Sequence, residues 1–175
     1  MGQYYKPVCT DTMEWLYSHN YDNGLKLMEH SYVGNSFVGA VMSLMTKGGK
    51  WCKKRIVWAG DYYDEEGETG YYGMVKDRDK LMPNSMSKAK QKKAFLLNHT
   101  KKEYVDYSKV IIGRWQWRIN PLPLLTACGN GRGGGDYYED NPDFDKVGIW
   151  ANDVLSISFV KPKDHKELIV KFHEE

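Results

Sequence analysis

The sequence predicts an α+β fold: one domain over residues 1–175, with a mostly antiparallel sheet, one main helix and long loops. Several short segments alternate apolar and polar residues, as strands with one buried face do. Only one segment repeats apolar residues clearly at helical spacing. Strands and helices do not alternate regularly, which argues against a doubly wound parallel sheet.

The first half of the chain carries the strong helix signal. A helix is expected over residues 31–45, because apolar side chains recur there every three or four positions. Asn35 or Ser36 is its expected N-cap, and Gly48 follows its end. The strands predicted in this half cover residues 3–8, 13–18 and 55–59.

The second half reads mainly as strands and loops. Residues 74–93 are polar and rich in lysine, so no firm element is predicted there. Pro121 and Pro123 interrupt the strand pattern that precedes them. The strands predicted in this half cover residues 95–99, 103–106, 110–112, 115–119, 154–160 and 167–172.

Composition limits the function classes. Hydrophobic residues make up 41% of the chain, and the formal net charge of +2 does not fit a strongly basic nucleic-acid binder. The positive charge is concentrated, because twelve Lys and Arg but four Asp and Glu lie between Lys76 and Arg118. This pattern fits solvated faces of opposite sign, or a surface for a polyanion or an acidic protein.

The expected location is the cytoplasm. Cys9, Cys52 and Cys128 are widely spaced and show no zinc-type spacing, which favours a reducing compartment. The first residues lack the apolar core of a signal peptide, and no apolar run is long enough to span a bilayer. No membrane partner is therefore expected.

The segment 129–135 contains five glycines and one arginine among seven residues. Glycines let backbone N–H groups approach a ligand closely, and successive N–H groups can form an anion-binding nest. Arg132 adds a planar fork of donors suited to phosphate. A flexible surface loop and a protein-contact loop remain alternatives. The predicted ligand-binding residues here are Gly131, Arg132, Gly133, Gly134, Asp136 and Tyr137.

Two further side chains are predicted to contact the ligand. Trp117 lies beside Arg118, so it offers a stacking surface next to a cation; the alternative is a place in a hydrophobic core rich in tryptophan. His30 follows an Asn-Gly turn and has polar neighbours; the alternative is a hydrogen-bonded structural histidine. His165 is expected to be exposed to solvent.

No metal or cofactor is predicted. The acidic segment after Asp61 lacks the spacing of an EF-hand, and a solvated loop explains it better. The chain contains neither a P-loop nor a GxSxG nucleophile motif. The segment 129–134 formally matches GxGxxG, but no βαβ unit surrounds it.

The whole chain resembles a family of bacteriophage and bacterial mobile-element proteins with no established activity. The likeness is carried by the segments MGQYYK (1–6), NGLKLMEHS (23–31), RIVWAGDY (55–62), NHTKKEY (98–104) and GNGRGGGDY (129–137). The resemblance implies a viral or prophage origin, a cytoplasmic location in the bacterial host and, by analogy, a host-interaction or anti-defence role.

Three functions are consistent with these observations. The leading hypothesis is a non-catalytic binding protein that captures a small anionic, nucleotide-derived ligand, and so sequesters a host defence signal. The first alternative is an inhibitor that binds a host protein through its charged patches. The second is an enzyme acting on a nucleotide or nucleic acid, with acid–base groups drawn from His19, His30, His99, Asp61 and Asp136.

Overall fold

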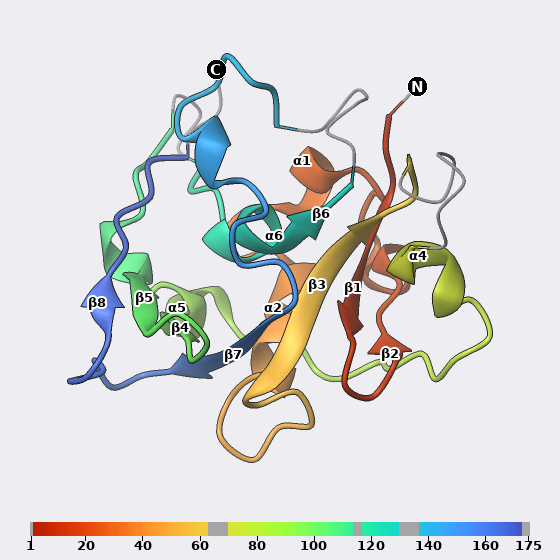
Figure 1. Ribbon diagram of the computed structural model, residues 1–175, viewed down its shortest axis with the longest axis horizontal. Coiled ribbons are helices and arrows are strands. Elements are labelled where there is room, and N and C mark those ends of the chain that lie inside the picture. Colours follow the sequence, from red (N-terminus) through yellow and green to blue (C-terminus); the bar gives the residue numbers. More distant parts are fainter. Residues whose placement is uncertain (1, 63–69, 114–116, 130–136, 173–175) are drawn as a thin grey trace.

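The computed structural model describes residues 2–62, 70–113, 117–129 and 137–172, and confirms a single-domain α+β fold with one main helix (Figure 1). The strands are β1 Tyr5–Cys9, β2 Glu14–Trp15, β3 Lys54–Gly60, β4 Phe95–Asn98, β5 Glu103–Asp106, β6 Ala127–Cys128, β7 Asp153–Ser158 and β8 Lys166–Glu167. The α-helices are α1 Leu27–His30, α2 Ser36–Leu44, α4 Tyr71–Met74, α5 Lys88–Gln91 and α6 Pro121–Thr126. Short 3₁₀ turns cover Ser18–Tyr21, Tyr107–Lys109 and Phe144–Lys146.

The strands form one mostly antiparallel sheet in the order β2-β1-β3-β7-β4-β5-β8. Strand β7 joins the two halves of this sheet: it pairs with the start of β3 on one side and with β4 on the other. The remaining part of β3 pairs in parallel with β6. Figure 1 shows β7 running between the β1–β3 group and the β4–β5–β8 group.

Strand β3 is buried on both faces, which explains its continuous apolar sequence. Ile56 and Trp58 belong to the main core, to which α2 and α6 also contribute. Val57 and Ala59 point to the opposite face, where they form a second cluster with Val75 next to α4. Helices therefore cover the central strand from both sides.

Helix α2 begins where the sequence predicts. The Asn35 side chain accepts a 3.0 Å hydrogen bond from the Val38 backbone N–H, so Asn35 is the N-cap. Phe37, Val38 and Val41 are fully buried in the main core. The helix occupies residues 36–44 of the predicted 31–45, and α1 precedes it as a separate short helix.

Helix α6 is the main element that the sequence pattern did not predict. Pro121 stands at its first turn, where a missing N–H costs no helical hydrogen bond. The Asn120 side chain caps this helix by accepting a 3.0 Å hydrogen bond from the Leu122 N–H. The two prolines therefore start a helix instead of only ending a strand.

The predicted strands 110–112 and 115–119 are not strands within the described residues. The described residues there form two isolated bridges, Ile112 with Arg118 and Ile119 with Tyr32, and residues 114–116 lie outside the described part of the chain. Of the predicted strand 167–172, only Glu167 is in a strand, at the end of β8.

Candidate functional site

A groove of about 1010 Å³ opens beside strands β4 and β7. Three connections form its walls: the segment between α2 and β3, the turn between β4 and β5, and the segment between β7 and β8. We call it the His99 groove. Its ionisable and hydroxyl-bearing side chains include His99, His165, Ser156, Lys53, Lys102 and Asp164.

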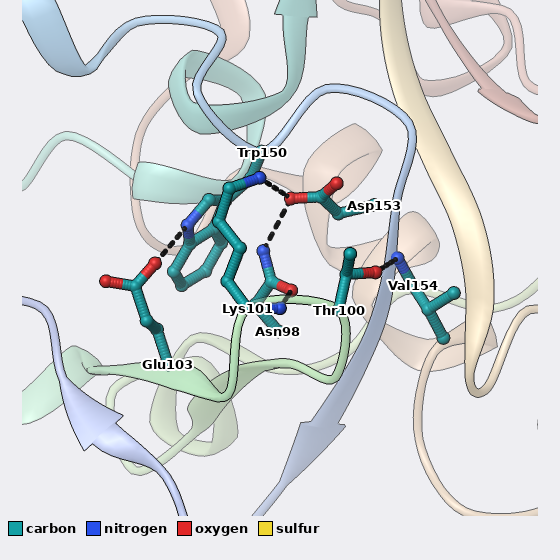
Figure 2. Close-up of polar contacts among 7 residues, drawn as sticks. All are labelled: Asn98, Thr100, Lys101, Glu103, Trp150, Asp153 and Val154. Atoms are coloured by element: carbon teal, nitrogen blue, oxygen red, sulfur yellow. Dashed lines mark hydrogen bonds and ion pairs between the residues drawn. The ribbon is translucent and has the colours of Figure 1, made fainter.

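A polar network fixes the β4–β5 turn that carries His99 (Figure 2). Asn98 is fully buried. Its side-chain NH₂ group donates a 2.8 Å hydrogen bond to the Asp153 carboxylate, and its side-chain oxygen accepts a 2.8 Å hydrogen bond from the Lys101 backbone N–H. Lys101 also pairs with Asp153 through its ammonium group. The Thr100 hydroxyl accepts a 3.0 Å hydrogen bond from the Val154 N–H.

These contacts attach the turn to the start of β7 and position its remaining side chains. The His99 N–H donates a 2.8 Å hydrogen bond to the Val154 carbonyl, so the histidine backbone is held by the same strand. Within the same turn, His99 and Lys102 line the groove. A network of this kind keeps site groups in place without a ligand.

His99 forms a close pair with Ser156 on β7. Its Nε2 shares a 2.7 Å hydrogen bond with the Ser156 hydroxyl, and the Ser156 residue is only 5% exposed. Partial burial and the positive charges of His165, Lys53 and Lys102 lower the pKa of His99 below its usual value. The neutral imidazole is therefore favoured near pH 7.

His165 packs edge-on against His99, with 5.4 Å between the ring centroids. Its Nδ1 hydrogen-bonds to the Asp164 carboxylate at 2.8 Å, and that contact lowers the pKa of Asp164. Its side chain is 4% exposed, so the expectation of a solvent-exposed histidine is wrong. The ring is covered because the β7–β8 segment folds it against the β4–β5 turn.

The Nε2 of His165 is buried and has no hydrogen-bond partner among the described residues. Such an unsatisfied polar atom costs free energy, on the order of 1–3 kcal/mol. A protein rarely keeps such an atom without a reason, and a ligand or water molecule that hydrogen-bonds to it removes the cost.

Positive charge dominates the groove. Lys47, Lys53, Lys102 and Lys161 line it, whereas Asp164 is its only lining carboxylate within the described residues. None of the four lysines forms an ion pair with a carboxylate in the described part of the chain. An anion in the groove therefore meets four lysines against one carboxylate.

Two of these lysines have an unusual backbone. Lys53 and Lys102 both have a φ of 56°, in the left-handed region that non-glycine residues avoid. That conformation costs on the order of 1–2 kcal/mol per residue. A glycine would satisfy the turn more easily, but it would supply no charge to the groove.

The groove also has an apolar wall. Leu97, Ile157, Phe159 and Val160 contribute to it, and Phe159 is 47% exposed. Pockets for small ligands combine such apolar walls with a few polar groups that fix the ligand's orientation. The groove has the composition needed to hold a molecule with both a charged and an apolar part.

The residues predicted from sequence are not gathered in this groove. Gly131, Arg132, Gly133, Gly134 and Asp136 lie outside the described residues. The other three predicted residues, Tyr137, His30 and Trp117, fall in separate places, described in turn below.

Tyr137 and His30 are both buried in the core. Tyr137 is 3% exposed, donates a hydrogen bond to the Pro142 carbonyl and stacks edge-on with Phe172. His30 is fully buried; its Nδ1 donates to the Gly24 carbonyl at 3.0 Å. Its Nε2 accepts from the Trp58 indole at 2.9 Å. The structural alternative for His30 therefore matches its surroundings.

Trp117 is the predicted residue that lies at the surface. It is 44% exposed and lines a small hollow of about 250 Å³ together with Tyr32. This hollow shares no lining residue with the His99 groove.

Of the residues in the His99 groove, only His99 is a functional candidate from the sequence, as an acid–base group of the enzyme alternative. Ser156, Lys53 and Lys102 were missed because their segments lie about 50 residues apart in the chain. The turn signal of residues 98–103, with polar side chains on both sides of His99, is the one local hint of a supported site.

The comparisons with known proteins assign no family. No protein-family model matches the chain, and no curated protein or solved structure is significantly similar to it. Within residues 2–62, 70–113, 117–129 and 137–172, no group of three or more potential metal ligands comes together. No helix in these ranges has the length and apolar character required to cross a membrane.

Proposed function

We propose that this protein binds a small anionic ligand in the His99 groove and that it acts by capturing this ligand. The observation that carries the proposal is the unequal charge of the groove: four lysines without described ion-pair partners line it, against one carboxylate. Cations in a partly enclosed site attract an anion more strongly than cations in open solvent do.

Ser156 and His165 offer polar groups that suit a phosphate. Ser156 carries a hydroxyl donor, and His165 carries the ring nitrogen that lacks a described partner. The Nδ1 of His165 already contacts Asp164, so Nε2 is the ring nitrogen that is left for a ligand. A phosphate that displaces water beside Ser156 and His165 can form hydrogen bonds with both side chains.

The apolar wall extends the proposal to a ligand with a ring. Phe159 and Val160 provide exposed apolar surface beside the lysines. A nucleotide-derived molecule combines a phosphate with a flat ring, so it is the class to test first. The phage origin and the anti-defence role implied by the sequence resemblance complete the proposal: the captured molecule is a nucleotide signal of the host.

A second candidate is favoured by one specific contact. The 2.7 Å hydrogen bond between Ser156 and His99, together with the lowered pKa of His99, resembles a nucleophile beside its base. That geometry supports a hydrolase acting on the same anionic ligand. Mass spectrometry separates the two functions, because binding returns the ligand intact and hydrolysis returns a product of different mass.

Titration calorimetry against inorganic phosphate and a panel of mono-, di- and cyclic nucleotides tests the proposal. At least one nucleotide is expected to bind. The double variant Lys53→Gln/Lys102→Gln is expected to bind it at least about 100-fold more weakly, because it removes two charged hydrogen bonds that contribute about 1.5–3 kcal/mol each.

Lys163→Gln is the matched control. Lys163 is exposed in the same β7–β8 segment but does not line the groove, so its variant is expected to keep wild-type affinity. No heat with any nucleotide or phosphate, or equal loss in both variants, contradicts capture in this groove.

A further inference from the structure

We infer that the hollow beside Trp117 is a separate binding site for one nucleobase together with its phosphate. Tyr32 and Trp117 form its aromatic wall, with ring centroids 5.1 Å apart and planes tilted by 38°. Trp117 is 44% exposed, so it remains accessible from solvent. Any nucleobase can stack on such an exposed ring, because every base has a flat aromatic face.

Backbone contacts hold both aromatic residues in place. The Val33 N–H donates a 2.7 Å hydrogen bond to the Arg118 carbonyl, and Tyr32 is bridged to Ile119. The Gly113 N–H donates to the Trp117 carbonyl at 2.6 Å. The Tyr32–Trp117 wall is therefore part of a small ladder and is preformed for a ligand.

The floor of the hollow is built around Gly34, which has a φ of 99°. Its N–H donates a 2.7 Å hydrogen bond to the fully buried Gln91 side chain. A Cβ at this position would lie 2.9 Å from the Lys88 side chain. The missing side chain lets Lys88 lie close over the backbone, next to the aromatic wall.

Three cations complete the hollow: Lys88, Lys92 and Arg118. No described carboxylate forms an ion pair with any of them, and no carboxylate is among the lining residues. Arg118 carries a planar fork of donors suited to a phosphate. The aromatic wall and these cations together fit a ring that carries an anionic group.

The size of the hollow limits the ligand. Its volume is about 250 Å³. Pockets for drug-sized ligands occupy about 300–1,000 Å³. One base with its phosphate suits this space better than a larger cofactor does. This inference does not depend on the function proposed above, because the two sites share no lining residue.

The base and phosphate can come from a free nucleotide or from a single strand of nucleic acid, and the experiment distinguishes these sources. Binding is measured by calorimetry for AMP and UMP, and by fluorescence anisotropy for a labelled dodecathymidylate. Binding of the mononucleotides alone identifies a free nucleotide. Binding of the oligonucleotide alone identifies a strand, and failure of both overturns the inference.

Variants of the aromatic wall test the stacking itself. Trp117→Ala is expected to weaken binding about tenfold, whereas Trp117→Phe keeps a ring and is expected to remain within about threefold of wild type. Arg118→Gln is expected to weaken binding and to reduce its salt dependence. An abasic oligonucleotide of equal length keeps the phosphates, so equal binding of it overturns the assignment of a base site.

The Lys53→Gln/Lys102→Gln variant separates this site from the His99 groove. It is expected to bind the Trp117 ligand with unchanged affinity. Thermal unfolding of each variant shows whether it is folded, and Trp117→Phe replaces an exposed side chain, so it provides a folded test even if Trp117→Ala does not. Equal loss of affinity in the Lys53→Gln/Lys102→Gln and Trp117→Ala variants contradicts two separate sites.

Discussion

The indole N–H of Trp58 donates a 2.9 Å hydrogen bond to Nε2 of His30, and neither side chain is exposed to solvent. The other ring nitrogen of His30 donates to the Gly24 carbonyl at 3.0 Å. The two contacts fix the neutral tautomer with its proton on Nδ1. A second proton on Nε2 would point directly at the indole N–H.

This arrangement predicts a loss of stability in mild acid. Burial lowers the pKa of His30 to about 4, from an unfolded value near 6.5. Between these two values the unfolded chain binds a proton that the folded chain does not, so stability falls as the pH falls from about 6.5 to about 4. The free energy of unfolding is expected to drop by about 3 kcal/mol over this interval because of His30.

Urea unfolding at pH 7.5 and pH 4.5 measures this effect. His30→Gln is expected to be less stable at pH 7.5 but to lose less stability on acidification than the wild type. His99 contributes with the same sign because its pKa is also lowered, so the difference between the two proteins isolates His30. Identical pH dependence in both would contradict the tautomer assignment.

Lys102→Gly is expected to stabilise the fold and weaken ligand binding. The φ of 56° at Lys102 suits glycine better than lysine, so the gain is up to about 1 kcal/mol, or about 2–4 °C in Tm. The same change removes a cation from the His99 groove. Thermal unfolding and nucleotide titration measure the two effects separately.

Asp22→Gly is the control for this variant, since Asp22 also has a φ of 56° but lies outside the groove. It is expected to raise Tm without changing affinity. If Lys102→Gly lowers Tm, the backbone argument fails. If it raises Tm and leaves affinity intact, Lys102 has no part in binding.

Asp153→Ala is expected to destabilise the protein by about 1–3 kcal/mol, because it leaves the fully buried Asn98 amide without its acceptor. Lys101→Ala removes only the exposed partner of the same carboxylate and is expected to cost less than about 1 kcal/mol. Denaturant unfolding compares the two. Equal costs would show that the ion pair, and not the buried amide, stabilises the turn.

Gly39→Ala is expected to destabilise the protein by about 1–3 kcal/mol, although alanine favours helices by about 1 kcal/mol over glycine. A Cβ at Gly39 would lie 2.8 Å from the Met86 carbonyl oxygen and 2.6 Å from the Gln91 amide nitrogen. Backbone atoms at that distance do not move aside easily. An increase in the urea midpoint of Gly39→Ala would show that residues 85–91 can move away from α2.

The parts of the fold that follow from local patterns were predictable from the sequence. Asn35 identifies the start of α2, and the polar residues 100–102 between two predicted strands identify the β4–β5 hairpin. Helix α6 was not predicted because Pro121 disfavours a strand and a helix interior alike, and only its place at the first turn makes it compatible. The conformational preferences of single residues do not show that Pro121 stands at the first turn of a helix.

The candidate sites were much less predictable. The pairing of β4 with β7 places His99 next to Ser156, although the two residues are more than 50 positions apart in the chain. Trp117 lies at the surface and not in a tryptophan-rich core, which is the alternative that the sequence leaves open. The sequence does not distinguish a structural role of His30 from a ligand-binding role, because the hydrogen-bond partner of His30, Trp58, is distant in the chain.

The position of Ser156 on β7 links any occupant of the groove to the interior hydrogen bonds of the sheet. Strand β7 shares its backbone amides with β3 on one side and with β4 on the other. Deuterium uptake at these strands requires the two halves of the sheet to separate, and a molecule held at Ser156 resists that separation. Occupancy would therefore slow isotope exchange across both halves at once, including at amides that the molecule never touches.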